Sequence, residues 1–490
     1  MTILSELNGH ISSNKLKLIL LATPIVVGSG AYLYYYYRKS GETQTSGNKT
    51  KKTITPLDKS LELKNKGNEC FRLSKYEDAL KLYTEAIQIC PVDRNKELST
   101  FYQNRAACYE NLKQHEKVVE DCSNAIKNDK LYVKAYLRRG KANEILNRYE
   151  DAAFDYYVAS CSSAFQNSDH MKLLFEVLEK FAYGKAREVM AKRTVNTFQI
   201  YLFRHIINKF SRDPLKFKSK ISNNYNEVVT NLLKDDSNDD SLDLDLKLLK
   251  GTIEMLIGKN ESGEERLRKI VDTCEENDYK INSEKIDSTN PDVYYIRSQM
   301  HLISKSFENA INDLNKSIEF DPNFACAIGQ KLYIEYQQSM MLNNFIKKNS
   351  IIEEFEKAVN KFPKSNELLL LYFQILLSNN ETKKAESFIN KALENDDTDP
   401  TLYVYRALVY VEEGDLEKTR EYLDKALKID SKCSFAYEIY ADLCSKLENM
   451  KDASSYLESA INCSTTFEDV KNLILKHKSL ELQNKAPSFS

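Results

Sequence analysis

The sequence predicts an all-α solenoid superhelix in which helical hairpins stack side by side, and three observations support this fold class. Four alanines, Ala358, Ala392, Ala426 and Ala460, recur every 34 residues, the length of a helix-turn-helix unit. The 490 residues include only 13 glycines and 9 prolines, but 30 tyrosines, which suits long helices packed through aromatic rows. With 70 basic and 72 acidic residues, the near-zero net charge gives no electrostatic case for nucleic-acid binding.

The first expected element is a transmembrane helix at residues 18–37. This segment, LILLATPIVVGSGAYLYYYY, contains no charge and is long enough to span a hydrocarbon core. We expect residues 1–17 to form a short N-terminal segment and residues 38–56, rich in Gly, Ser, Thr and Lys, to form a flexible tether. More basic residues follow the span than precede it, so the large C-terminal part should stay in the cytosol. The alternative is a cleaved secretory signal with its cleavage site near residues 28–31.

Residues 57–160 contain three repeats with small and aromatic residues at fixed spacings. The first has Gly67, Tyr76, Ala79, Tyr83, Ala86 and Pro91, the second Ala106 and Ala125, and the third Gly140, Tyr149, Ala152, Tyr156 and Ala159. These positions match the tetratricopeptide repeat (TPR) template, in which small residues let two helices approach and aromatic rings fill the space between them. The sequence therefore predicts a first TPR block here.

The rest of the chain predicts a second block after an irregular segment. Residues 161–245 are helical without a clear repeat and include the aspartate-rich run KDDSNDDSLDLD, most simply a solvated loop. Periodicity returns over residues 246–485, beginning with a repeat marked by Phe307, Ala310, Leu314 and Pro322 and continuing through the alanine-phased units. We expect the tail, residues 470–485, to cap the solenoid.

Five polar residues of the first block are expected to face one groove, because residues four apart lie on one face of a helix. They are Lys64, Asn68, Asn104, Lys134 and Arg138. Three cations and two amides would suit a peptide that ends in carboxylates. The neighbouring Arg139 and Lys141 are expected to be ordinary solvated charges.

The motifs K-x-x-x-N in LKNKGNE, the Asn of FYQNRAA and K-x-x-x-R in VKAYLRR carry these five residues. This pattern resembles the two-carboxylate clamp of co-chaperone TPR domains. The resemblance implies that the five residues grip the acidic C-terminus of cytosolic heat-shock chaperones of the seventy and ninety kDa classes.

A wider resemblance covers nearly the whole chain. The anchor ending in YYYYR, the stretches STFYQNRAACYENL and YVKAYLRRGKANE, and DVYYIRSQM at the start of the second block occur in an order similar to the 70 kDa import receptor family of the mitochondrial outer-membrane translocase, the TOM complex. The resemblance implies a single-pass outer-membrane protein with residues 1–17 on the intermembrane-space side. Its implied partners are chaperones, mitochondrial preproteins and other TOM subunits.

In that family the second TPR block holds the preprotein, and inner-helix positions give the candidate contacts here. They are Tyr295, Gln299, Glu335, Glu367, Tyr403 and Glu438, with Glu367 and Glu438 favoured because KSNELLLLYFQ and SKCSFAYEIYADL resemble family groove segments. Acidic groups would suit basic or amphipathic segments. The alternative for Tyr295 and Tyr403 is simple packing between helices.

The sequence does not predict an enzyme, a cofactor or a metal site. No phosphate-binding, zinc-protease or nucleophile-elbow motif is present, and the six histidines are dispersed. The ten cysteines form no C-x-x-C pair, which favours reduced thiols over a disulfide framework. Two other non-catalytic functions stay open: a membrane-anchored co-chaperone of another organelle, such as the endoplasmic reticulum, and a structural TPR scaffold.

Overall fold

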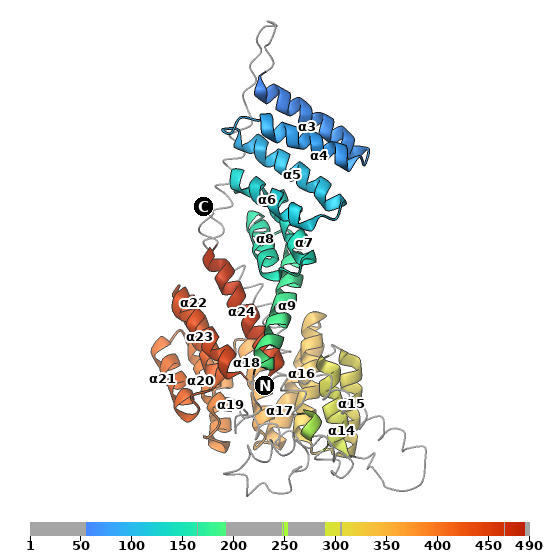
Figure 1. Ribbon diagram of the computed structural model, residues 1–490. Helices are drawn as coiled ribbons and strands as arrows, with labels where there is room; N and C mark the ends of the chain where they lie inside the picture. Colours follow the sequence, from blue (N-terminus) through green and yellow to red (C-terminus); the bar gives the residue numbers. More distant parts are fainter. Residues whose placement is uncertain are drawn as a thin grey trace, which may run out of the picture. The chain divides into compact units, whose positions relative to one another are not determined.

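The computed structural model describes residues 55–163, 165–192, 247, 249–252, 290–303, 306–464 and 466–485. All regular structure in these ranges is α-helical and consists mainly of antiparallel hairpins (Figure 1). The described residues belong to two compact units, 55–185 with 478–485, and 186–477. The prediction of an all-α TPR solenoid is confirmed.

The first unit contains three hairpins and a longer helix. Their bounds are α3 (Pro56–Arg72) with α4 (Tyr76–Ile89), α5 (Asn95–Asn111) with α6 (His115–Asn128), and α7 (Val133–Ile145) with α8 (Tyr149–Ser162), followed by α9 (Ser168–Ala191), which continues past residue 185.

The second unit contains five hairpins and a C-terminal helix. They are α14 (Pro291–Ile303) with α15 (Phe307–Phe320), α16 (Ala325–Met341) with α17 (Phe345–Lys361), α18 (Asn366–Ser378) with α19 (Thr382–Asn395), α20 (Pro400–Glu413) with α21 (Leu416–Ile429), and α22 (Ser434–Lys446) with α23 (Met450–Cys463), followed by α24 (Phe467–Lys485), which continues past residue 477.

No helix within these described ranges is both long and apolar enough to cross a bilayer. The predicted anchor at residues 18–37, the segment 1–17, most of the tether and the aspartate-rich loop lie outside the described residues.

The start of α3 shows why the first block begins where the predicted tether ends. Thr55 Oγ1 accepts a hydrogen bond from the Asp58 N–H at 3.1 Å, and the Thr55 N–H donates to Asp58 Oδ2 at 3.1 Å. This capping box satisfies two backbone donors that a helix end leaves without partners. Pro56 follows the cap at the first helical position, where its fixed φ suits the helix and its missing N–H is not needed.

Contacts between a glycine and a tyrosine hold the two helices of the first and third hairpins close together. A Cβ built on Gly67 would lie 2.8 Å from Tyr83 Cε1, and one on Gly140 would lie 2.7 Å from Tyr156 Cε1. Both tyrosines are buried. The aromatic ring therefore rests directly on the backbone of the facing helix, as the repeat template predicts.

The second unit has a long continuous core built around α18. Six consecutive residues of this helix, 368–373, are buried, so α18 is apolar on all sides. The Tyr372 ring stacks on Phe355 of α17 with ring centroids 5.6 Å apart and meets Phe388 of α19 edge-on at 4.9 Å. Such aromatic contacts connect neighbouring hairpins along the solenoid.

Replacing Gly140 with alanine should destabilise the first unit, because the added methyl group would collide with Tyr156. We expect the free energy of unfolding to fall by about 1–3 kcal/mol, as for other overpacked cores. Gly184, in α9, is the matched control because no described atom lies within 4 Å of a Cβ built there. Gly184→Ala should raise the free energy of unfolding by up to about 1 kcal/mol through helix propensity alone. Urea unfolding followed by circular dichroism measures both; equal effects would contradict the close-approach interpretation.

Candidate functional site

The two asparagines of the predicted clamp lie side by side on neighbouring inner helices. Asn104 Nδ2, on α5, donates a hydrogen bond to Asn68 Oδ1, on α3, at 3.1 Å. The Tyr83 hydroxyl donates to the same oxygen at 2.6 Å. Because this oxygen already accepts two hydrogen bonds, Asn68 has its NH₂ group to offer to an incoming carbonyl or carboxylate.

Arg138, the clamp arginine on α7, contacts α5. Its Nε donates to Glu110 Oε2 at 2.8 Å, and its Nη1 lies 3.4 Å from the carbonyl oxygen of Gln103. Lys141 Nζ donates to the other oxygen of Glu110 at 2.9 Å. Burial opposes ionisation of Glu110, but the hydrogen bonds from Arg138 and Lys141 outweigh it and lower the pKa of this carboxyl group. Glu110 thus occupies Arg138 in the ligand-free protein.

Within the described ranges, neither clamp lysine forms an ion pair with an acidic side chain. Lys64 Nζ donates to Asn65 Oδ1 at 2.8 Å on the surface of α3. Lys134 is exposed on α7, one turn before Arg138 and on the same face. The structure therefore brings Asn68 and Asn104 into direct contact, places Arg138 against α5 and leaves the lysines near solvent; the role of all five in binding remains a prediction.

The expectation that Arg139 is an ordinary solvated charge is wrong. Arg139 Nη2 and Nε donate to Asp155 of α8 at 2.7 and 3.0 Å, and the Asp155 side chain is only 1% exposed. Arg105 with Asp121 and Arg297 with Asp313 repeat this two-bond geometry at the same separation of 16 residues. These pairs join the two helices of a hairpin, and their signal in the sequence is an Arg before the small residue of the first helix with an Asp 16 positions later.

In the second unit, two of the predicted groove residues are interior. Tyr295 is buried against Phe324 with ring centroids 5.0 Å apart, and burial raises its pKa well above the usual value. Gln299 is also buried; its Nε2 donates to Ser298 Oγ at 3.1 Å, while its Oε1 has no hydrogen-bond partner among the described residues. The packing alternative for Tyr295 therefore agrees with its surroundings.

Glu367 faces an aromatic interior that joins several inner helices. Burial raises the pKa of both Tyr295 of α14 and Tyr405 of α20, and the negative charge of Glu367 of α18 contributes to both increases. Gln374 lies about two helical turns after Glu367 on α18, and its Nε2 donates to the Tyr405 hydroxyl at 3.4 Å. Tyr405 was not singled out from the sequence, although it lies two residues after the candidate Tyr403.

The other candidates lie in more polar surroundings. Glu335 is half-buried on α16. Tyr403 donates its hydroxyl hydrogen to the Asp397 carbonyl oxygen at 3.2 Å and lies beside the Tyr422 ring. Glu438 of α22 accepts a hydrogen bond from Lys476 of α24 at 3.0 Å.

Lys476 also donates to Asp442, 2.6 Å away, so it binds two carboxylates of α22. Burial alone would lower the pKa of this lysine, but the charges of Asp442 and Glu438 outweigh it and raise the pKa. The C-terminal helix thus neutralises part of the acidic surface that Glu438 was predicted to offer a client.

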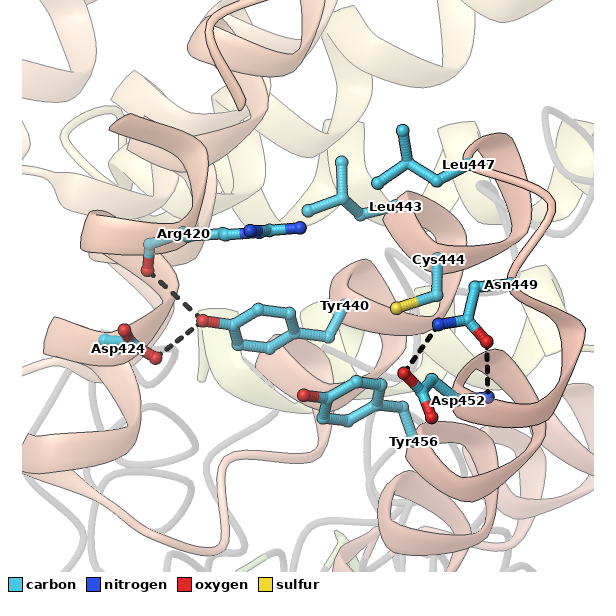
Figure 2. A pocket seen from close by; sticks show the side chains of 9 residues that line it. All are labelled: Arg420, Asp424, Tyr440, Leu443, Cys444, Leu447, Asn449, Asp452 and Tyr456. Carbon is cyan, nitrogen blue, oxygen red and sulfur yellow. Dashed lines mark hydrogen bonds between the residues drawn. The ribbon is translucent and has the colours of Figure 1, made fainter. Parts of the chain in front are cut away.

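A separate open pocket of about 460 Å³ lies among α21, α22 and α23 (Figure 2). The stacked rings of Tyr440 and Tyr456, with centroids 5.0 Å apart, form one wall, and the Tyr440 hydroxyl donates to Asp424 Oδ1 at 2.5 Å. Its other lining residues are Arg420, Leu443, Cys444, Leu447, Asn449 and Asp452. None of the predicted clamp residues or preprotein-groove residues lines this pocket.

Removing Asp155 should strongly destabilise the first unit, because the charge of Arg139 would lose its buried partner. We expect Asp155→Ala to lower the free energy of unfolding by about 3–5 kcal/mol, as for other broken buried pairs. Glu116→Ala is the control, since Glu116 pairs with Arg148 but is 64% exposed and should contribute about 1 kcal/mol or less. Thermal and urea unfolding measure both; similar losses would contradict a structural role for the Arg139–Asp155 pair.

Comparison with known proteins agrees with this architecture. Models of the tetratricopeptide repeat match residues 60–92 and 291–324, and the model described as anaphase-promoting complex, cyclosome, subunit 3 matches residues 378–460. The mitochondrial import receptor subunit TOM70 of Rattus norvegicus is 29% identical over 478 residues, which cover 86% of this chain and 78% of that protein. TOM70 of Saccharomyces cerevisiae is 25% identical over 93% of this chain and 85% of its own length.

The crystal structure of yeast Tom70 aligns with 87% of this chain and 96% of that one at 24% identity, with a TM-score of 0.38. The extent of the sequence matches confirms the resemblance predicted from the motifs. This TPR protein is related over nearly its whole length to the mitochondrial import receptor subunit TOM70.

Proposed function

We propose that this protein is a receptor of the mitochondrial outer membrane that accepts preproteins from cytosolic chaperones and holds them for transfer to the import pore. The observation that carries the proposal is the contact between Asn68 and Asn104 on neighbouring inner helices, with Lys134 and Arg138 on the next one, in a chain similar to TOM70 over most of its length. The predicted anchor at residues 18–37 would hold it in the membrane.

The first unit would bind a chaperone's acidic C-terminus by exchanging one carboxylate for another. In the free protein Glu110 accepts hydrogen bonds from Arg138 and Lys141. A peptide carboxylate that approaches Arg138 would compete with Glu110 for the guanidinium, while Asn68 and Asn104 would donate to oxygens of the same peptide. Lys134 is exposed and Lys64 is half-buried on α3, so both would turn toward a ligand and add charge after the peptide docks.

The second unit would hold the preprotein along its inner helices. Of the candidates, Glu367 is half-buried on α18 and presents a carboxylate beside an aromatic core that includes the buried Tyr295 and Tyr405. Such a surface suits an amphipathic segment that buries an apolar side and presents a basic group. Glu438 would contribute less than Glu367, because Lys476 already neutralises it.

Arg138→Ala should weaken the binding of a peptide ending in Glu-Glu-Val-Asp by roughly 2 kcal/mol, the lower end of the loss expected for a desolvated charge pair, because Arg138 must first leave Glu110. Isothermal titration of the full-length chain measures the change. Arg148→Ala is the control, since Arg148 lies in the same repeat but pairs with the exposed Glu116. Unchanged affinity for Arg138→Ala would instead favour a TPR scaffold without a clamp.

Glu110→Gln should have the opposite effect in the same titration. Without its charge, residue 110 competes less well for Arg138, and peptide affinity should rise by up to about fivefold, the equivalent of one partly exposed ion pair. Glu116→Gln should leave the affinity as it is. Weaker binding by the Glu110 variant would show that Glu110 orients Arg138 for the ligand rather than competing with the ligand.

A fluorescent protein fused to the C-terminus should label the mitochondrial rim, because we place the anchor at residues 18–37 and the large domain in the cytosol. Deleting residues 18–37 should make the label diffuse, because this is the segment that the sequence predicts to span the membrane. Fluorescence microscopy with a mitochondrial marker distinguishes the outcomes. A reticular pattern without mitochondrial overlap would contradict the proposal and favour an anchored co-chaperone of the endoplasmic reticulum.

A further inference from the structure

The turn between α16 and α17 exposes five apolar side chains together. They are Met340, Met341, Leu342, Phe345 and Ile346, which we call the apolar tip, and their exposed fractions range from 42% for Met340 to 87% for Ile346. Scattered exposed apolar residues are common on soluble proteins, but a contiguous group of this kind marks a surface that meets another apolar phase.

The other hairpins show that this turn departs from the repeat. In the seven other described hairpins the second residue of the second helix is charged; these residues are Glu77, Glu116, Glu150, Glu308, Lys383, Glu417 and Lys451. In α17 this residue is Ile346. A charged residue at this position suits solvent exposure, and among the described hairpins only the one formed by α16 and α17 has an apolar residue there.

The hairpin is also longer, and the extra length lies at the apolar tip. Helix α17 has 17 residues, whereas each of the other seven second helices has 14. Ala358, like Ala392 and Ala426, lies three residues before the end of its helix, so the three additional residues of α17 precede this common packing position. They extend the helix by about 4.5 Å toward the turn.

The backbone of the apolar tip is largely satisfied by internal hydrogen bonds. The Leu342 and Asn344 N–H groups donate to the carbonyl oxygens of Gln338 and Ser339 at 3.0 and 2.9 Å. Asn344 Oδ1 accepts from the Lys347 N–H at 3.0 Å and caps α17. A turn with few free backbone polar groups can enter an apolar phase at low cost.

Two lysines follow the apolar tip directly. Lys347 is exposed. The Lys348 ammonium lies 5.9 Å from the centre of the Tyr336 ring, which belongs to α16 of the same hairpin. The turn residues Asn343 and Asn344 are uncharged, and the next acidic residue along the chain is Glu353. Long cationic side chains behind an apolar group can reach lipid phosphates while the group itself enters the acyl region.

We propose that the apolar tip inserts into the interfacial layer of a lipid bilayer that contains anionic lipids, with Lys347 and Lys348 on the headgroups. A protruding turn favours a membrane over a polypeptide, because a client segment needs a concave surface to bury both of its sides. This contact would be additional to the anchor predicted at residues 18–37 and does not depend on the chaperone clamp.

The chain contains no tryptophan, so one substitution creates a unique fluorescent reporter. Leu342→Trp places it in the apolar tip, on the helix-capping residue of α16. Leu447→Trp is the matched control in the same unit, because Leu447 is exposed and caps α22 at a turn that carries Glu448 and Lys451. Both full-length variants are incubated with phosphatidylcholine vesicles that contain or lack phosphatidylglycerol, with ordinary or brominated acyl chains.

We expect vesicles with phosphatidylglycerol to shift the emission of the Leu342→Trp protein to shorter wavelength, and brominated chains to quench it, whereas the control should show neither change. Adding Lys347→Gln and Lys348→Gln should weaken the contact with anionic vesicles by on the order of tenfold. Equal quenching of both reporters, or none, would overturn the proposal. So would a shift without quenching that grows with protein concentration, which indicates a second copy, or one that requires an added unfolded polypeptide, which indicates a client surface.

Discussion

The close approach of two helices within each hairpin is the constraint on which the solenoid and its candidate site depend. Gly67 and Tyr83 show how this contact also prepares the site. The Tyr83 ring fills the space that the missing side chain of Gly67 leaves, and its hydroxyl donates to Asn68, the next residue of α3. A side chain at position 67 would push the tyrosine away and would remove a hydrogen bond that orients the Asn68 amide. Packing and recognition thus share one aromatic residue.

The sequence predicts size-dependent packing well, because a small residue and an aromatic residue at a fixed spacing have few other uses in a helical repeat. Charges are harder to interpret. Arg138 and Arg139 are adjacent and chemically identical, yet one contacts Glu110 on a neighbouring inner helix and the other is held by the buried Asp155. Successive residues of a helix are rotated by about 100°, so the two arginines face different neighbours. In the sequence, the feature that distinguishes Arg139 is the Asp 16 positions later.

The groove of the second unit was predicted less completely for the same reason. Periodicity identified α20 as an inner helix but did not show which tyrosine turns inward; Tyr405 does, whereas Tyr403 bonds to a loop carbonyl. The pairing of Glu438 with Lys476 depends on where α24 packs within this unit, and no spacing within a single repeat contains that information. The residues of the predicted anchor lie outside the described ranges, so that expectation rests on hydropathy alone.

The ion pair between Glu110 and Arg138 bears on how a clamp of this kind can be both stable and selective. An unpaired guanidinium at a half-buried position would be costly, and an internal carboxylate removes that cost in the free protein. A ligand carboxylate that replaces it exchanges one ion pair for another, so Arg138 contributes less to binding than a guanidinium without an internal partner would. Selectivity for a peptide with several acidic groups then comes from Lys64 and Lys134, which pair with no acid in the part of the chain that the structure describes, together with the directed amides of Asn68 and Asn104. A ligand with a single acidic group would only replace Glu110 at Arg138, whereas a peptide with a terminal carboxylate and a second acid would also bind the lysines.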